Sequence, residues 1–332
     1  MGLGLSWNRL SSCGVFTDMV IASLVLAQAS LNPTQAFESK LAEIFDRAEV
    51  PGISASVILP DGKQFSFAKG KADEGGEVDL LVAHRFAGGS SGKMHFAVLA
   101  MNLAEEGKLD LDAPVSKYLG DLDWFDRLPV EGSATVRQFL NHTSGMREHI
   151  QSPTFIPAVV KDPLKQWSMK EALSHTFDQE PLFAPGEGWS YADSNYIIAA
   201  LAMEEASGGD AYDQISELTI NKLVLTQTEP STKLEYKWLA NGKYFPGNPF
   251  GDGWALADGK FKINPQFEWA GGGFITSPRD LATLARSIVN GTVVSKESAR
   301  EMMQGVAAKT GPGHEYGLGL QIRPTDLGKS YG

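Results

Sequence analysis

The chain has 332 residues, 42% of them hydrophobic, and carries a formal net charge of −11. This length and apolar content are enough for a large core, in one two-lobed enzyme or in two domains. The excess of acidic residues argues against nucleic acid or an anionic membrane surface as a partner, because both would repel the protein.

The N-terminal segment 1–29 is predicted to be a secretion signal. Arg9 precedes an apolar run at 19–26, and the small-x-small motif Ala27-Gln28-Ala29 follows as a cleavage site. The apolar run is too short to form a stable membrane span. Cleavage after Ala29 would remove Cys13, the only cysteine of the chain. An exported protein without disulfides indicates a bacterial periplasmic or secreted location.

Hydrophobic periodicity predicts helices and strands near both ends of the remaining chain. In chain order they are a helix at 33–48, strands at 52–59 and 64–68 that form a hairpin, helices at 278–289 and 295–303, and a strand at 316–322. The region between them is predicted to contain mainly helices and loops. Its helices are expected at 136–142, 169–175, 196–206 and 211–223, whereas 230–265 has no clear period.

Strands at both ends with helices between them favour an α/β architecture of the α+β type. We expect an antiparallel sheet that is closed by distant segments and flanked by helices, with an inserted all-helical lobe. Residues 30–107 and 266–332 would form the discontinuous α/β lobe, and residues 108–265 the mostly helical lobe.

The first chemical motif is Ser90-Ser-Gly-Lys93, at the start of a helix pattern that ends near Gly107. Ser90 and Lys93 lie three residues apart, so on a helix their side chains share one face. A serine needs a neighbouring base to become a nucleophile, and a lysine is a base only in its neutral form. The positive end of the helix dipole favours both the neutral lysine and a developing oxyanion.

The same spacing also arises by chance, and the chain contains a second copy at Ser66 and Lys69. This copy falls in the strand predicted at 64–68, where residues three apart point to opposite faces of the sheet. Ser66 and Lys69 therefore cannot cooperate, and Ser90 is the better candidate for a nucleophile.

Further short blocks follow in order along the chain. They comprise 86–93, 105–119, 136–145, 185–196, 268–273, 277–281 and the Tyr316-Gly-Leu-Gly319 segment. Together these blocks resemble the serine β-lactamase-like hydrolases, which include class C β-lactamases, D-alanyl-D-alanine peptidases and related esterases. The resemblance covers roughly residues 35–332. It implies a β-lactamase/transpeptidase-like fold and hydrolysis through an acyl-enzyme intermediate.

The resemblance also implies a role for Tyr191-Ala-Asp193, which stands where the family carries Tyr-x-Asn. Tyr191 would act as general base or acid beside Ser90, with Lys93 as its partner. Without the resemblance, Tyr191 would be interpreted as a packing aromatic residue in a loop between Trp189 and Tyr196.

Asp193 departs from the family pattern. An asparagine can donate a hydrogen bond to a substrate carbonyl, whereas an ionised aspartate only accepts. A carboxylate beside Lys93 also favours the ammonium form of that lysine, which shifts the role of base towards Tyr191. We hypothesise that Asp193 disfavours β-lactams and peptides as substrates and favours esters.

The glycines Gly271 and Gly272 are predicted to form a tight backbone passage beside the substrate cleft, and so to contribute to substrate binding. The resemblance also implies a Lys-Thr-Gly or His-x-Gly strand after Gly319 that completes the oxyanion hole begun by the Ser90 N–H. The sequence reaches Gly332 without it, and Lys309-Thr-Gly311 lies too early, in a predicted loop.

We therefore expect C-terminal strands to be missing and the strand at 52–59 to have an unpaired edge. Loss of one oxyanion donor typically costs about 100- to 1000-fold in rate. The chain would then be either a truncated form of a longer enzyme or a weakened or non-catalytic relative.

Other motifs are interpreted as structural. The segment 88–92 also matches the Gly-x-Ser-x-Gly nucleophile elbow, but the buried strand and the α/β alternation that this fold needs are lacking. The segment His142-Thr-Ser-Gly145 is expected to be a helix end and turn without a catalytic role. The histidines have no metal-ligand spacing, and 271–273 lacks the Lys-Ser/Thr of a phosphate loop, so we expect no metal and no cofactor.

The sequence thus predicts a serine hydrolase that acts on small-molecule ester, peptide or β-lactam substrates, with Ser90, Lys93 and Tyr191 as catalytic residues and Asp193, Gly271 and Gly272 as substrate-binding residues. The alternative is a truncated or non-catalytic binding protein of β-lactamase fold. The substrate class and the oligomeric state stay open.

Overall fold

The computed structural model describes residues 32–326 and 328–332. The predicted secretion signal, its cleavage site at Ala29 and Cys13 lie outside these residues. Within them, no helix is both long enough and apolar enough to cross a membrane.

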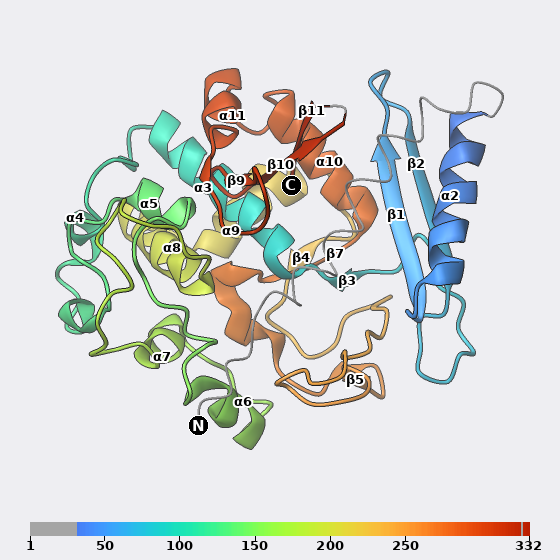
Figure 1. Ribbon diagram of the computed structural model, residues 1–332, viewed down its shortest axis with the longest axis horizontal. Coiled ribbons are helices and arrows are strands. Elements are labelled where there is room, and N and C mark those ends of the chain that lie inside the picture. Colours follow the sequence, from blue (N-terminus) through green and yellow to red (C-terminus); the bar gives the residue numbers. More distant parts are fainter. Residues whose placement is uncertain (1–31, 327) are drawn as a thin grey trace.

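A helix and a two-stranded antiparallel hairpin form one edge of the molecule (Figure 1). The helix is α2 (Pro33–Arg47), and the hairpin consists of β1 (Gly52–Ile58) and β2 (Gln64–Gly70), as predicted. Helix α2 packs on one face of the hairpin and α10 (Pro278–Val289) on the other. Because both faces are covered, every residue of β1 is half-buried.

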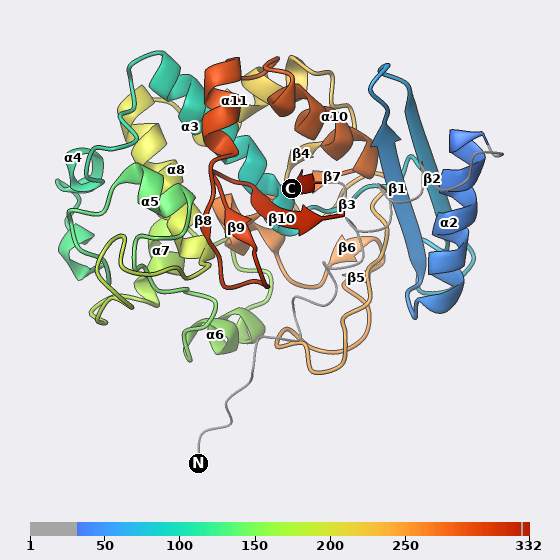
Figure 2. The ribbon, with the colours of Figure 1, turned by 45° about the horizontal axis from the view of Figure 1, so that its top comes forward.

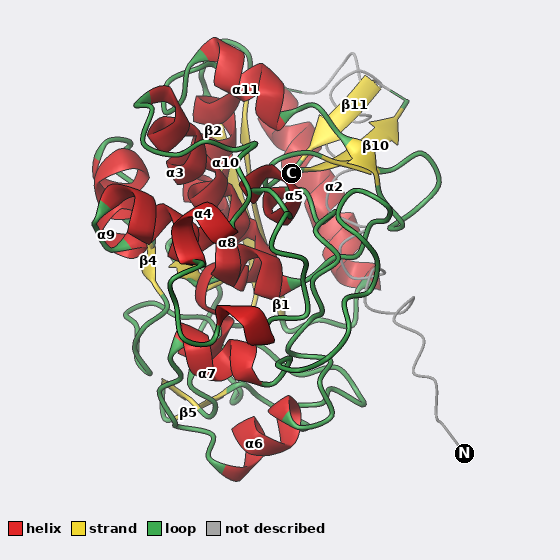
Figure 3. Ribbon diagram, turned by 90° about the vertical axis from the view of Figure 1, so that its left-hand side faces the viewer, coloured by secondary structure: helices red, strands yellow, loops and turns green. Residues whose placement is uncertain are grey.

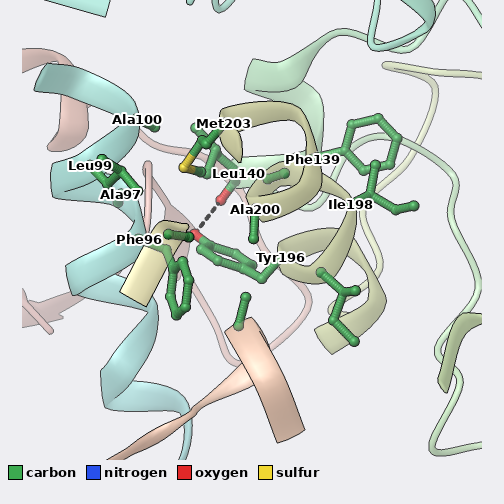
Figure 4. Close-up of a cluster of buried hydrophobic side chains, with 14 of the residues drawn as sticks. Phe96, Ala97, Leu99, Ala100, Phe139, Leu140, Tyr196, Ile198, Ala200 and Met203 are labelled. Carbon is green, nitrogen blue, oxygen red and sulfur yellow. Dashed lines mark hydrogen bonds between the residues drawn. The ribbon is translucent and has the colours of Figure 1, made fainter. Parts of the chain in front are cut away.

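Two long helices, α3 (Lys93–Glu105) and α8 (Asp193–Ser207), form the centre of the core. Both are apolar nearly all round, as is typical of helices enclosed by other elements. Figure 4 shows Phe96 and Leu99 of α3 facing side chains of α8, where the Tyr196 hydroxyl donates a 2.8 Å hydrogen bond to the Leu140 carbonyl. This packing holds the N-terminal end of α3, and the 3₁₀ turn η2 (Gly89–Gly92) that precedes it, in a fixed position.

Shorter helical segments surround this pair, with α4, α5 and α7 grouped around α8 (Figure 3). These segments are α4 (Ser116–Leu119), η3 (Phe125–Arg127), α5 (Val136–Leu140), α6 (Phe155–Lys161), α7 (Met169–Ser174), α9 (Ala211–Ile215), the π-helical turn η4 (Ser216–Asn221), η5 (Pro265–Gly271) and α11 (Lys296–Met302).

The predicted helices at 136–142 and 169–175 are confirmed, and each begins with a capping box, at Thr135 and Ser168 respectively. The helix predicted at 196–206 begins earlier, at Asp193, and the one predicted at 211–223 is divided between α9 and η4. The short segments α4, η3 and α6 were not predicted, because they are too short to show a helical period.

The remaining strands are short and pair antiparallel. Strand β7 (Phe274–Thr276) lies between β3 (Phe86–Ala87) and β4 (Glu229–Pro230), and so joins three distant parts of the chain. A second sheet has the order β11-β10-β9-β8 (Figure 2). Its strands are β8 (Val306–Ala307), β9 (Glu315–Tyr316), β10 (Gln321–Thr325) and β11 (Gly328–Tyr331), while β5 (Leu256–Ala257) and β6 (Lys260–Phe261) form a small hairpin.

The prediction of a single strand at 316–322 is wrong. The chain reverses direction between β9 and β10, which pair with each other. Gly319 has a φ of 72°, and a Cβ atom there would lie 2.6 Å from the Ala97 Cβ of α3. The glycines of this segment therefore allow a tight turn that packs closely on α3. The apolar pattern of the sequence did not reveal this turn.

The antiparallel pairing agrees with the predicted class, but the strands near the two chain ends do not share one sheet. In the described part of the chain, β1 pairs with β2 alone. The absence of further strands and the lobe boundaries at 107 and 265 both stay predictions.

Candidate active site

Ser90 lies in η2, directly before α3, and its side chain is exposed. The first N–H groups of a helix have no partner within the helix and point towards its N-terminal end. The Ser90 hydroxyl therefore sits beside backbone donors that attract a negative charge. Lys93, one turn further on, is completely buried beneath it.

The Lys93 ammonium has three hydrogen-bond acceptors. Its Nζ lies 3.3 Å from the Ser90 Oγ and 2.5 Å from an Asp193 carboxylate oxygen, and it also donates to the Gly271 carbonyl. The Tyr191 and Tyr196 rings lie 4.8 and 5.3 Å from the same nitrogen. These contacts use all three N–H donors of a charged lysine, which leaves no lone pair for accepting a proton from Ser90.

The Tyr191 side chain lies beside Ser90 and Lys93, with its ring 4.8 Å from the Lys93 Nζ. Burial raises the pKa of Tyr191 well above its usual value, the charge of Asp193 raises it further, and the neighbouring Ser90 hydroxyl opposes this only in part. Tyr191 is therefore a neutral phenol. A phenol can accept a proton on its oxygen while it donates its own, so this side chain is placed for proton transfer.

Asp193 is the first residue of α8, and its side chain is 16% exposed. Burial raises the pKa of Asp193, while the charge of Lys93 opposes that rise. The Asp193 side chain packs against Gly271, where a Cβ atom would lie 2.6 Å from the Cβ of the aspartate. A Cβ atom on Gly92 would lie 1.6 Å from the Gly272 carbonyl oxygen. The tight backbone passage at 271–272 is thus confirmed, whereas its role in substrate binding stays a prediction.

Two further carboxyl groups near Asp193 were not predicted. Glu148 accepts the backbone N–H of Asp193 and contacts the His149 Nδ1 at 2.9 Å. Burial raises the pKa of Glu148, but the bond from His149 and the backbone N–H bonds outweigh this and place it below its usual value. Burial raises the pKa of Glu268 to about 7, and the charge of Asp193 adds to this effect. No motif spacing links these residues, since each reaches the site from a different segment.

Glu268→Gln is expected to remove a pH dependence of stability. The pKa of Glu268 rises from 4.5 to about 7 on folding, so between these values the folded state binds the extra proton. The free energy of unfolding contributed by this group therefore falls as the pH rises from about 4.5 to about 7, by at most about 3 kcal/mol. Urea denaturation of the wild-type and Glu268→Gln proteins across this pH range measures the contribution of Glu268 to the free energy of unfolding. A difference in the free energy of unfolding between the two proteins that does not change with pH would contradict this prediction.

The alternative motifs lie away from this cluster. Ser66 donates to Ser56 and Lys69 pairs with Asp46, so the second Ser-x-x-Lys copy does not cooperate, as predicted. The segment Lys309-Thr-Gly311 lies in the loop between β8 and β9, also as predicted, and Thr310 bonds to His314 there. Over residues 32–326 and 328–332, no group of three or more His, Cys, Asp or Glu side chains could hold a metal ion.

Comparison with known proteins identifies the class. The family model described as Beta-lactamase matches residues 37–332, and the chain therefore belongs to this family. Two curated relatives are PbpX of Bacillus subtilis, named as a penicillin-binding protein, and Esterase EstB of Burkholderia gladioli. The chain is 25% identical to PbpX over 71% of its own length and 26% identical to EstB over 55%. The matches cover 53% and 50% of these relatives, so the chain spans about half of their length.

Among solved structures, a D-stereospecific amidohydrolase from a Streptomyces species is 27% identical, with a TM-score of 0.75. The match covers 90% of this chain and 85% of that one. A D-amino acid amidase from Ochrobactrum anthropi has a TM-score of 0.76 at 22% identity, with 90% and 83% covered. The predicted β-lactamase/transpeptidase-like fold is thus confirmed.

Proposed function

We propose that the protein is a serine hydrolase that acts through an acyl-enzyme on small esters and amides. The observation that carries this proposal is the buried Lys93 ammonium, which donates to the Ser90 hydroxyl and lies 4.8 Å from the ring of the neighbouring Tyr191 phenol. The names of the similar esterase and amidohydrolase agree with this reaction.

In the first half-reaction, the Ser90 oxygen attacks the carbonyl carbon and its proton passes to the Tyr191 oxygen. Tyr191 gives its own proton to the leaving oxygen or nitrogen as the bond to that atom breaks. The Ser90 N–H and the adjacent helix N-terminus stabilise the tetrahedral oxyanion. Water then attacks the ester, its proton passes through Tyr191 to the Ser90 oxygen, and the acid leaves. Lys93 keeps its proton throughout and stabilises the negative charge that develops on Ser90.

The charges around the site favour substrates without a carboxylate. Asp193 pairs with the buried Lys93, and Glu148 lies beside Asp193, as does Glu268, which is ionised above a pKa of about 7, so a further negative charge there would be repelled. We therefore propose uncharged esters and amides rather than β-lactams, which carry a carboxylate. The prediction that Asp193 disfavours β-lactams points the same way on a separate ground, because an ionised aspartate cannot donate a hydrogen bond to the substrate carbonyl.

A fluorophosphonate probe tests the proposal, because it forms a covalent adduct with an activated serine. Intact mass of the folded 332-residue chain is expected to show one adduct, which Ser90→Ala abolishes. A p-nitrophenyl ester, an amino acid amide and a chromogenic cephalosporin then compare the substrate classes. Folded protein without any adduct would contradict the proposal and favour the non-catalytic binding protein.

A further inference from the structure

His142 lies immediately beneath the segment that carries Tyr191. It follows the C-terminal end of α5 and is completely buried. Its φ of 65° is in the left-handed region, which a non-glycine residue rarely adopts and which costs about 1 kcal/mol or more. Such a strained conformation at a buried polar residue is retained only where its contacts hold it.

Two atoms of His142 hold the residues on either side of Tyr191. Its carbonyl oxygen accepts the Ser190 N–H at 3.0 Å, and its ring Nδ1 accepts the Ala192 N–H at 3.3 Å. The backbone before and after Tyr191 is therefore fixed by one residue from a different part of the chain.

The hydrogen-bond network fixes which ring nitrogen carries the proton. The Met146 N–H donates to the Ser144 Oγ, so that hydroxyl donates onward to the Asn195 Oδ1 at 2.6 Å. The Asn195 amide nitrogen then faces the His142 Nδ1 at 3.0 Å and donates to it. Nδ1 is thus the acceptor of two bonds, and the proton of the neutral ring is on Nε2.

The imidazole also supports the Tyr191 ring from below. The two ring centroids lie 4.3 Å apart, and the Tyr316 ring lies 4.6 Å from the imidazole on another side. The Nε2–H has no hydrogen-bond partner among the described residues and is surrounded by these rings. Burial holds the pKa of His142 well below its usual value, and the charge of Lys93 lowers it further, so the ring stays neutral.

We propose that His142 is a positioning residue, which holds the Tyr191 side chain beside Ser90 and Lys93 by fixing the backbone on both sides of Tyr191 through its carbonyl and its Nδ1. The proposal rests on the proposed serine hydrolase function and deepens it. It also agrees with the expectation that the segment 142–145 has no catalytic role of its own, because no atom of His142 takes part in the proton transfer.

Two variants distinguish the effect of the Nδ1 hydrogen-bond acceptor from the effect of the size of the ring. His142→Phe keeps an aromatic ring but removes the acceptor. His142→Asn keeps an oxygen acceptor at the position of Nδ1 and tolerates the left-handed backbone. Each is made in the wild-type chain and in Tyr191→Phe, and circular dichroism confirms that each is folded.

Leaving-group dependence is the main readout, because an alkyl ester needs a proton from Tyr191 more than a p-nitrophenyl ester does. His142→Phe is expected to lower kcat for the alkyl ester by about 100-fold with little change in KM, since a displacement of about 1 Å costs that much. The loss with the p-nitrophenyl ester is expected to be much smaller. His142→Asn should stay within about fivefold of the wild type, and in Tyr191→Phe the His142→Phe change should cause no further loss.

An equal loss on both esters, or an undiminished loss in Tyr191→Phe, would overturn the proposal. So would a folded His142→Asn protein that is as impaired as His142→Phe, and this second variant decides the question if His142→Phe does not fold. Amide hydrogen exchange at Ala192 adds a readout that does not depend on turnover. His142→Phe should speed this exchange at least about tenfold, and unchanged exchange would contradict the proposal even if the wild type proves inactive and the proposed function fails.

Discussion

Lys93→Met is expected to abolish measurable turnover and to destabilise the fold. Methionine has a similar length but no charge, so the Asp193 carboxylate would remain in the core without its cation. Removing one member of a buried ion pair costs about 3 to 5 kcal/mol. Turnover should fall by at least about 1000-fold, because the positive charge 3.3 Å from the Ser90 oxygen is lost in the proposed reaction. Urea denaturation and hydrolysis of a p-nitrophenyl ester measure the two effects.

The double variant Lys93→Met/Asp193→Asn distinguishes stability from catalysis. Asparagine removes the unpaired charge, so most of the stability is expected to return. Turnover should not return with it. A single Lys93→Met variant that hydrolyses the ester within about tenfold of the wild-type rate would show that the lysine is not part of the machinery.

Gly92→Ala is expected to be the most disruptive conservative substitution near the site. The added Cβ atom would lie 1.6 Å from the Gly272 oxygen and 2.9 Å from the Phe274 ring. A backbone carbonyl cannot move aside as a flexible side chain can, so η2 and the 271–272 passage would have to separate. We expect a loss of about 3 kcal/mol or more in the free energy of unfolding, at the upper end of overpacking effects. The midpoint of a urea titration measures it.

Gly89→Ala is the matched control in the same turn. Gly89 has a φ of 50°, and a Cβ atom there would meet nothing within 4 Å. Only the backbone penalty of about 1 kcal/mol is expected. If the two alanine variants were equally stable, the close approach between η2 and the 271–272 passage would not be the constraint on position 92.

The parts of the site that could be predicted from sequence are those carried by local patterns. Ser90 and Lys93 belong to one helix start, and their proximity follows from helical geometry alone. Tyr191 and Asp193 could be predicted through the family resemblance, because they lie in a short block with a recognisable order. The hairpin and α10 could be predicted because each has a clear period and clear end signals.

The parts that could not be predicted depend on contacts between distant segments. Glu148 and Glu268 are ordinary acidic residues in their own surroundings, and only the fold brings them to Asp193. The turn at 317–320 has the apolar composition of a strand, and its reversal is set by the space available beside α3. His142 was correctly predicted to lie at a helix end. Its two hydrogen bonds to the Tyr191 segment could not be predicted, because their partners lie about fifty residues further along the chain.

The three acceptors of the Lys93 ammonium belong to residues 90, 193 and 271. During synthesis, the proposed nucleophile therefore leaves the ribosome long before two of the partners that orient its lysine. Until residue 271 has emerged, the Lys93 ammonium lacks one of these three acceptors. The site proposed for hydrolysis is thus completed only late in synthesis.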